Sequence, residues 1–495
     1  MNTADYLLAS GQDQDLALIS GKEKCTYFDL RQASARMAAK LTGAGVEPGE
    51  KVAILGSNSL FWVASYLAAM KVGAVAVPFA TTLTPEEAGV MARFAGCRRM
   101  CIDRRLYLRF GPQLGQEISF YFDDDLSTAV AEEWPPAAGI DDLNAVAALM
   151  FTSGTTARPR AVQVTHRNIQ ANTDSIIEYL ELDARDRMMD ILPFYYCFGA
   201  SLMHTHLRAG GSLVMATSFV YPEMVLDQME QEGCTGIAGV PSNYQTLLRN
   251  SSFPRRKMKT LRKVQQAGGK LQDVLIRELI QAVPQAKVFV MYGQTEATAR
   301  LSYLNPGLLD TRLGSVGKGI PGVTLKVIGE SGEQVRPGEV GEIYAWGENV
   351  SPGYFNDPEA TAQKFVDGAL HTGDLAVVDE DGYIFVVDRK ADFIKSCGFR
   401  VSSQQIEACI IELPEVVAAA VIGEPDLVRG EAILAFVVIK DGSPLTKNEV
   451  IKHCARRLAS HMVPQDVVFI DKLPLNANGK VVKTELRKRI GAAEG

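Results

Sequence analysis

Short apolar segments alternate with stretches of helical periodicity from Tyr27 to about residue 300. One cycle runs from the helical pattern DLRQASARMAAKLTGAG to the apolar runs KVAILG and GAVAVPF, each bounded by Gly or Pro. The same rhythm returns at SLVMAT, at TGIAGVPSNYQTLLRN and at AKVFVMYG. Strands and helices that alternate in this way form a mostly parallel sheet covered by helices. The sequence therefore predicts an α/β fold.

The pattern changes twice further along the chain. After Gly314, the segment GVTLKVIGESGEQVRPGEVGEIYAWG is typical of short strands joined by Gly-rich and Pro-rich turns. Near Asp388 a compact unit of helices and strands begins, with an amphipathic helix that starts after Thr446. We therefore predict a large N-terminal domain of α/β subdomains plus a small β subdomain (residues 1–388), followed by a small α+β C-terminal domain (residues 389–495).

Charge and hydropathy exclude several classes of protein. The net charge of -7 argues against a large nucleic-acid interface, which is normally basic. The most apolar stretch, Phe61 to Ala80, is divided by Lys71 and Gly73, which favours a helix followed by a buried strand over a membrane span. The start of the sequence lacks the pattern of a secretory signal, and its eight cysteines are scattered. These features predict a cytoplasmic protein with reduced cysteines.

A loop rich in Ser, Thr and Gly lies within LMFTSGTTARPRAVQVTH, Leu149 to His166. It joins the strand candidates AVAALMF and AVQVT, and a helix begins around Thr165. A Walker A loop would run directly into a helix and would contain Gly-Lys-Ser/Thr, which this loop lacks. Closely spaced hydroxyls and backbone N–H groups can wrap the oxygens of a polyphosphate. A solvated connection remains the alternative on composition alone.

Three later segments carry further candidate residues. MYGQTEAT places Thr295 and Glu296 after an apolar strand, where a carboxylate can hold Mg²⁺ beside a phosphate. HTGD places Asp374 in a Gly-Asp turn, where its carboxylate can accept two hydrogen bonds from a ribose diol. LPLNANGK places Lys480 in an exposed Asn-Gly turn, for which an ordinary surface lysine is the alternative interpretation.

In this order, the segments resemble the adenylate-forming superfamily of acyl-CoA synthetases, stand-alone adenylation enzymes and luciferases. The resemblance extends from about Tyr27 to Leu486. It implies an AMP-forming acid-thiol ligase that binds ATP, Mg²⁺ and a carboxylic acid, makes acyl-AMP and pyrophosphate, and then transfers the acyl group to coenzyme A. A carrier-protein phosphopantetheine is the alternative acceptor. A catalytically silent nucleotide-binding regulatory module is the alternative from another class of protein.

The resemblance also implies roles for individual residues. The expected catalytic residues are Lys480, Thr152, Glu296 and Arg389, with Glu296 as the metal ligand. ATP is expected to bind at Thr152, Ser153, Gly154, Thr155, Thr156, Arg160, Gly268, Tyr292, Gly293, Thr295, Asp374, Arg389 and Lys480. The acid is expected to bind at Tyr196, Cys197, Phe198, Gly199, Ala267, Gly268 and Gly269. Lys395 is expected to act in the thioester-forming step.

The sequence departs from the family pattern in two places. Ala157, Arg160 and Ala161 stand where the phosphate loop usually has Gly, Lys and Gly, and alanine at a position that needs positive φ costs about 1 kcal/mol. The resemblance implies a mobile C-terminal domain that rotates between the two half-reactions about a hinge residue, usually Asp or Lys. Ala391 stands at this hinge position.

The resemblance also bears on the substrate. In amino-acid-activating relatives an aspartate pairs with the α-amino group of the substrate; Cys197 stands at that position here, and no acid lies between Leu192 and Gly210. A buried ammonium without a partner is costly, so an α-amino acid substrate is disfavoured.

Overall fold

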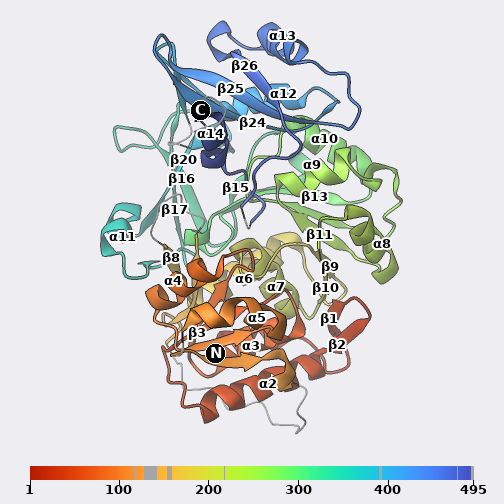
Figure 1. The fold of residues 1–495 in the computed structure, drawn as a ribbon, viewed down its shortest axis with the longest axis vertical. Coiled ribbons are helices and arrows are strands. Elements are labelled where there is room, and N and C mark those ends of the chain that lie inside the picture. Colours follow the sequence, from red (N-terminus) through yellow and green to blue (C-terminus); the bar gives the residue numbers. More distant parts are fainter. Residues whose placement is uncertain are drawn as a thin grey trace.

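The computed structural model describes residues 1–115, 117–126, 142–152, 159–216, 218–389, 393–476 and 478–491. In these ranges the strands form four sheets. The first strands of the chain lie at the bottom of Figure 1, the last strands lie at the top, and the middle of the chain lies between them. No helix in the described ranges combines the length and the apolar character needed to cross a membrane.

The first sheet has seven strands, and its centre is parallel. In spatial order the strands are β18 (Gly353–Tyr354), β8 (Ala161–Thr165), β7 (Val146–Phe151), β4 (Val75–Phe79), β3 (Lys51–Leu55), β5 (Arg99–Ile102) and β6 (Ser119–Phe122). Its chain segment also contains α2 (Tyr27–Gly43), α3 (Leu60–Lys71), α4 (Pro85–Ala95) and α5 (Arg104–Leu114). The apolar stretch after Phe61 is therefore a helix followed by the fully buried strand β4, as predicted.

The second sheet has nine strands, and it is parallel from β13 to β1. The spatial order is β15 (Lys318–Gly319), β14 (Ser302–Leu304), β13 (Lys287–Tyr292), β12 (Lys263–Gln266), β11 (Gly236–Gly239), β9 (Arg187–Asp190), β10 (Ser212–Met215), β1 (Leu16–Ser20) and β2 (Glu23–Thr26). The helices of these segments are α1 (Thr3–Leu8), α6 (His166–Leu180), α7 (Cys197–Ala209), α8 (Pro222–Glu232), α9 (Pro241–Arg249) and α10 (Asp273–Ala282).

The third sheet is antiparallel, and the fourth sheet belongs to the C-terminal part. The third sheet contains β16 (Val323–Ile328), β17 (Gly341–Gly347), β20 (Ala369–Val378), β19 (Phe365–Val366) and β21 (Ile384–Arg389), with α11 (Pro358–Lys364) in the same segment. The fourth contains β23 (Phe399–Val401), β22 (Ile394–Ser396), β25 (Gly430–Ile439), β24 (Val416–Asp426) and β26 (Asp466–Phe469), with α12 (Ser403–Ile411), α13 (Lys447–Arg457) and α14 (Lys483–Gly491).

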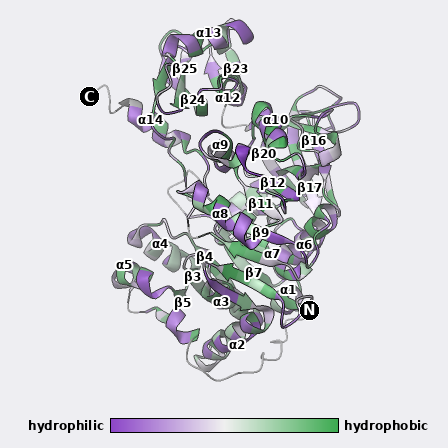
Figure 2. Cartoon of the chain, turned by 90° about the vertical axis from the view of Figure 1, so that its right-hand side faces the viewer, coloured by the Kyte–Doolittle hydropathy of each residue, from purple (hydrophilic) through white to green (hydrophobic). Residues whose placement is uncertain are grey.

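Local sequence signals place the helix boundaries. Thr26, Thr165 and Thr446 each accept a hydrogen bond from the third residue of the following helix, which satisfies a backbone N–H that would otherwise lack a partner. Burial then selects the inner faces. In Figure 2 the hydrophobic colour gathers around β7 and α7 in the interior, whereas α13 and α14 carry much hydrophilic colour. The predicted fold class, a large α/β part with a small β sheet and a small α+β C-terminal part, is confirmed.

The C-terminal part packs against the second sheet through a buried arginine. Arg249, at the end of α9, donates to the backbone oxygens of Ile411 at 3.0 Å and of Leu413 at 3.2 Å. The same guanidinium pairs with Glu278 at 2.6 Å. These bonds satisfy carbonyls at the end of α12 and contribute to the contact between the two parts in the present orientation, in which Lys480 lines a cavity with residues of the N-terminal part.

Candidate active site

A cavity of about 420 Å³ collects residues from distant parts of the chain. Its wall includes these residues that the sequence singles out: Thr152, Arg160, Tyr196, Cys197, Phe198, Ala267, Gly268, Gly293, Thr295, Glu296, Asp374 and Lys480. Most of them follow the ends of strands β7, β9, β12 and β13; Arg160 precedes β8, Asp374 comes from β20, and Lys480 comes from the C-terminal part. Such convergence at the carboxyl ends of parallel strands is typical of ligand sites in α/β proteins.

The other predicted residues lie beside this cavity or apart from it. Tyr292 and Gly269 line a neighbouring cavity of about 100 Å³. Gly199 packs closely, because a Cβ there would lie 2.2 Å from the backbone oxygen of Pro193. Lys395 is exposed on β22 and belongs to neither wall. Arg389 ends β21, where its backbone is paired with Asp374. Outside the described residues lie Ser153, Gly154, Thr155, Thr156, Ala157 and Ala391.

The turn after β13 carries the predicted cation ligand. A Cβ on Gly293 would lie 2.0 Å from the backbone oxygen of Ala299, so only glycine permits this close approach. Oε1 of Glu296 accepts a hydrogen bond from the hydroxyl of Tyr354 at 2.7 Å. Burial, together with the charge of Glu296, raises the pKa of Tyr354, so the phenol stays a protonated donor. A half-buried carboxylate in the cavity wall is the oxygen ligand that Mg²⁺ prefers, so this residue fits a magnesium site.

The predicted Gly-Asp turn is wrong, because Gly373 and Asp374 lie inside strand β20. The strand is irregular at this point: Gly373 has a φ of +78°, and the pairing of β20 shifts register on both sides. A glycine followed by a polar residue is typical of bulges as well as of turns, because both need a residue with positive φ. The sequence therefore does not distinguish the two. Asp374 is only 6 % exposed, and its Oδ2 accepts a hydrogen bond from the Tyr292 hydroxyl at 2.6 Å.

The predicted turn at Lys480 is present, but its lysine is half-buried in the cavity wall and not exposed. Oδ1 of Asn476 accepts hydrogen bonds from the backbone N–H groups of Asn478 and Lys480, at 2.9 and 3.0 Å. The hydroxyl of Ser242, in α9, donates to the backbone oxygen of Gly479 at 2.9 Å. Nζ of Lys480 lies 5.9 Å from the centre of the Tyr196 ring. The turn therefore delivers an ammonium group to the cavity.

The predicted acid pocket lies at the start of α7. Cys197 begins this helix, and its sulfur accepts a hydrogen bond from the Thr295 hydroxyl at 3.4 Å. Burial raises the pKa of Cys197, while Thr295, Lys480 and Arg300 act in the opposite direction. A protonated thiol offers no charge to an ammonium group. The expectation that an α-amino acid is not the substrate therefore stays a prediction, based on the absence of a charged partner at Cys197.

Sequence reasoning missed an arginine and a buried carboxylate near this pocket. Arg300 lies in the cavity wall, with its guanidinium carbon 4.0 Å from the centre of the Phe198 ring. Asn58 fixes the segment before Tyr196 through its side-chain amide, which donates to Asp190 at 2.7 Å and accepts from the backbone N–H of Phe194 at 2.9 Å. Arg300 could have been found from the sequence, because it lies only four residues after Glu296. The contact of Asn58 with Asp190 could not, because the two residues are far apart in the sequence.

Asp190→Asn is expected to reduce the pH dependence of stability. Burial raises the pKa of Asp190 to about 8, so the folded protein keeps a proton that the unfolded chain releases near pH 4. The free energy of unfolding should therefore fall as pH rises from about 4 to about 8. Asparagine does not titrate, and its amide oxygen can still accept from Asn58. The Tm of the variant, measured by thermal unfolding, should rise relative to wild type between pH 5 and 8; parallel curves would refute this.

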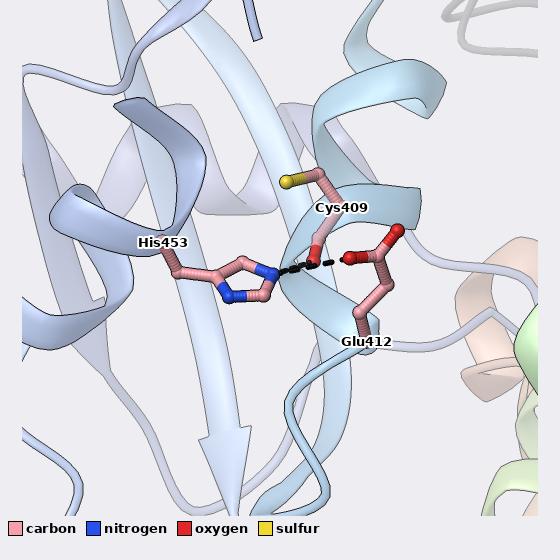
Figure 3. A group of neighbouring side chains, drawn as sticks. All are labelled: Cys409, Glu412 and His453. Atoms are coloured by element: carbon pink, nitrogen blue, oxygen red, sulfur yellow. Dashed lines mark hydrogen bonds and ion pairs between the residues drawn. The ribbon is translucent and has the colours of Figure 1, made fainter. Parts of the chain in front are cut away.

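Away from the cavity, three potential metal ligands lie together between α12 and α13 (Figure 3). They are Cys409, Glu412 and His453, whose ligand atoms all lie within 4.8 Å of one another. Nε2 of His453 lies 3.0 Å from the backbone oxygen of Cys409 and 3.3 Å from Glu412. The guanidinium of Arg457 pairs with the same carboxylate at 2.8 Å. This cation already occupies the carboxylate, so we assign the group to the contact between the two helices.

Similarity to known proteins identifies the family. Residues 8–355 match the AMP-binding enzyme family, and residues 405–480 match the AMP-binding enzyme C-terminal domain. A feruloyl-CoA synthase of an Amycolatopsis species is 33% identical over 498 residues, which is 96% of each chain. ATP-bound MatB from Rhodopseudomonas palustris has a TM-score of 0.88 at 28% identity, covering 99% of this chain and 98% of MatB. The o-succinylbenzoate-CoA synthetase MenE from Bacillus subtilis, in complex with its acyl-adenylate intermediate, has a TM-score of 0.85 at 28% identity and 98% coverage of both chains.

The fold and the cavity define an adenylate-forming enzyme. The chain belongs to the AMP-binding enzyme family, as the motifs of the sequence predict. The predicted enzyme class, an AMP-forming acid-thiol ligase, is confirmed by this membership and by the ligases among the relatives.

Proposed function

We propose that this chain is an acyl-CoA or aryl-CoA synthetase that activates a carboxylic acid with Mg·ATP. The observation that carries the proposal is the convergence of Glu296, Asp374 and Lys480, from three separate segments, on one cavity. Two relatives support ATP as the substrate and acyl-AMP as the intermediate: MatB was solved with ATP, and MenE with its acyl-adenylate. Coenzyme A as the acceptor is supported by the relatives named as CoA synthases and ligases.

In the first step, an oxygen of the acid attacks the α-phosphorus of ATP and pyrophosphate leaves. The ammonium of Lys480 stabilises the negative charge that develops at the α-phosphate. Asp374 binds the ribose hydroxyls, Tyr292 stacks on adenine and Thr295 contacts the α-phosphate. Glu296 would hold Mg²⁺, which supplies charge neutralisation for the phosphates. The β and γ phosphates bind along the loop from Thr152 to Thr156 and at Arg160, and Arg389 supports the ribose or the phosphates.

In the second step, a thiol attacks the acyl carbon and AMP leaves. We infer that the C-terminal domain, residues 389–495, rotates about Ala391 relative to residues 1–388 between the two steps. The third sheet ends at Arg389 and the fourth begins at Ile394, which supports a boundary between them. Lys395 is exposed in the present orientation, so a rotation that carries it to the cavity would explain its expected role in thioester formation.

A cytoplasmic location is part of the proposal. All eight cysteines are free thiols, and seven of them are at least partly buried, which fits a reducing compartment.

ATP–pyrophosphate exchange over a broad panel of carboxylic acids tests the proposal. At least one acid should support exchange that depends on Mg²⁺, and addition of coenzyme A should then yield an acyl thioester and AMP. Silence with every acid would instead favour the regulatory module. Thioester formation on a carrier-protein phosphopantetheine, with none on free coenzyme A, would identify the other acceptor.

A further inference from the structure

Arg300 is a buried cation without an anionic partner in the wall of the acid pocket. Arg300 is 1 % exposed, and its Nη2 atom has no hydrogen-bond partner. Among the ion pairs formed by the described residues, none involves Arg300. Arginine stays protonated in proteins, so this charge cannot be removed by loss of a proton. An unpaired buried charge is strongly destabilising, which calls for a compensating interaction.

The contacts of Arg300 fix its position but leave it without an oxygen acceptor for Nη2. Its backbone oxygen accepts from the side chains of Asn172 at 3.1 Å and Asn349 at 2.8 Å. Its guanidinium lies over the Phe198 ring, and Nε contacts the sulfur of Met291 at 3.4 Å. The hydroxyl of Tyr179 also interacts with the Arg300 side chain. A neutral phenol, an aromatic face and a thioether are weak partners compared with a carboxylate, which can accept two parallel hydrogen bonds from a guanidinium.

We propose that the preferred substrate is a dicarboxylic acid, whose second carboxylate pairs with Arg300. This inference rests on the proposed function and names the substrate class for the same site. The second carboxylate takes no part in the chemistry; the first attacks the α-phosphorus, and pyrophosphate leaves as before. Arg300 and Phe198 both line the cavity in which the acid is expected to bind, and the guanidinium carbon lies 4.0 Å from the centre of the Phe198 ring. An acid with a methyl group in place of the second carboxylate leaves the charge of Arg300 unpaired.

Matched acids test the proposal in the ATP–pyrophosphate exchange assay. The pairs are succinate with butyrate, glutarate with pentanoate, and isophthalate with 3-methylbenzoate. For the best pair, kcat/KM of the dicarboxylate should exceed that of its partner by about tenfold or more. Arg300→Met should lower the dicarboxylate value by about tenfold or more and leave the monocarboxylate within about threefold of wild type. Arg300→Lys, which keeps the charge, should retain part of the preference.

Three results would overturn the inference, and they are distinguishable from failure of the proposed function. Equal use of both acids by the wild-type enzyme overturns the substrate class alone. Equal loss with both acids in Arg300→Met, together with weaker binding of a non-hydrolysable ATP analogue, would show that Arg300 serves the nucleotide. No exchange with any acid would overturn the proposed function and this inference together. Thermal unfolding of both variants controls for misfolding. The comparison of the matched acids in the wild-type enzyme does not depend on the variants.

Discussion

Lys480→Ala is expected to lower the rate of acyl-AMP formation by about a hundredfold to a thousandfold, the usual effect of removing a group that stabilises charge in the transition state. The structure holds Lys480 in the cavity through the turn at Asn476 and the bond from Ser242 to Gly479. Thioester formation from supplied acyl-AMP should stay within about threefold of wild type. In that step the thiol attacks the acyl carbon, so no charge that Lys480 stabilises develops by attack on the α-phosphorus. ATP–pyrophosphate exchange measures the first step, and thioester release from synthetic acyl-AMP measures the second.

The matched control is Lys472→Ala. Lys472 lies in the same segment as Lys480 but is exposed, so its loss changes the net charge equally and should change neither step. Equal losses of both steps in Lys480→Ala would contradict the role assigned to this lysine and would indicate a general disturbance of the C-terminal part. Retention of full exchange activity would remove Lys480 from the catalytic residues.

The sequence predicted those parts of the fold that depend on local patterns. Apolar periodicity located the helix after Phe61 and strand β4, and the threonine caps located the starts of α6 and α13. Both signals act within a few residues, and tertiary packing did not override them here. The hydroxyl-rich segment likewise joins two strands, β7 and β8, as its flanking apolar runs predict.

The features that the sequence did not reveal depend on contacts between distant segments. Gly373 and Asp374 have the composition of a turn, yet pairing with β17 and β21 holds them inside a strand. Lys480 has the pattern of a surface residue, and only docking of the C-terminal part buries it in the cavity wall. Arg300 is separated from Phe198 by about a hundred residues of sequence, so neither local periodicity nor turn chemistry indicates that one covers the other.

Asp374→Ala is expected to raise the KM for ATP by on the order of a hundredfold, because the two ribose hydroxyls lose the charged acceptor of their hydrogen bonds. The carboxylate is nearly buried and is held by the hydroxyl of Tyr292 at 2.6 Å. Tyr292→Phe removes this donor and keeps the ring. Its KM for ATP should therefore rise much less, by about fivefold.

Deoxynucleotides separate ribose binding from a general disturbance of the site. Wild-type enzyme should discriminate strongly against 2′-deoxy-ATP and 3′-deoxy-ATP, whereas Asp374→Ala should use ATP and both analogues almost equally, because the residue that reads the hydroxyls is gone. Tyr292→Phe should keep the discrimination. Removal of an acceptor that binds the ribose must also remove the preference for the ribose hydroxyls. If Asp374→Ala still discriminated as the wild type does, Asp374 would not bind the ribose, and the rise in KM would have another cause in the cavity.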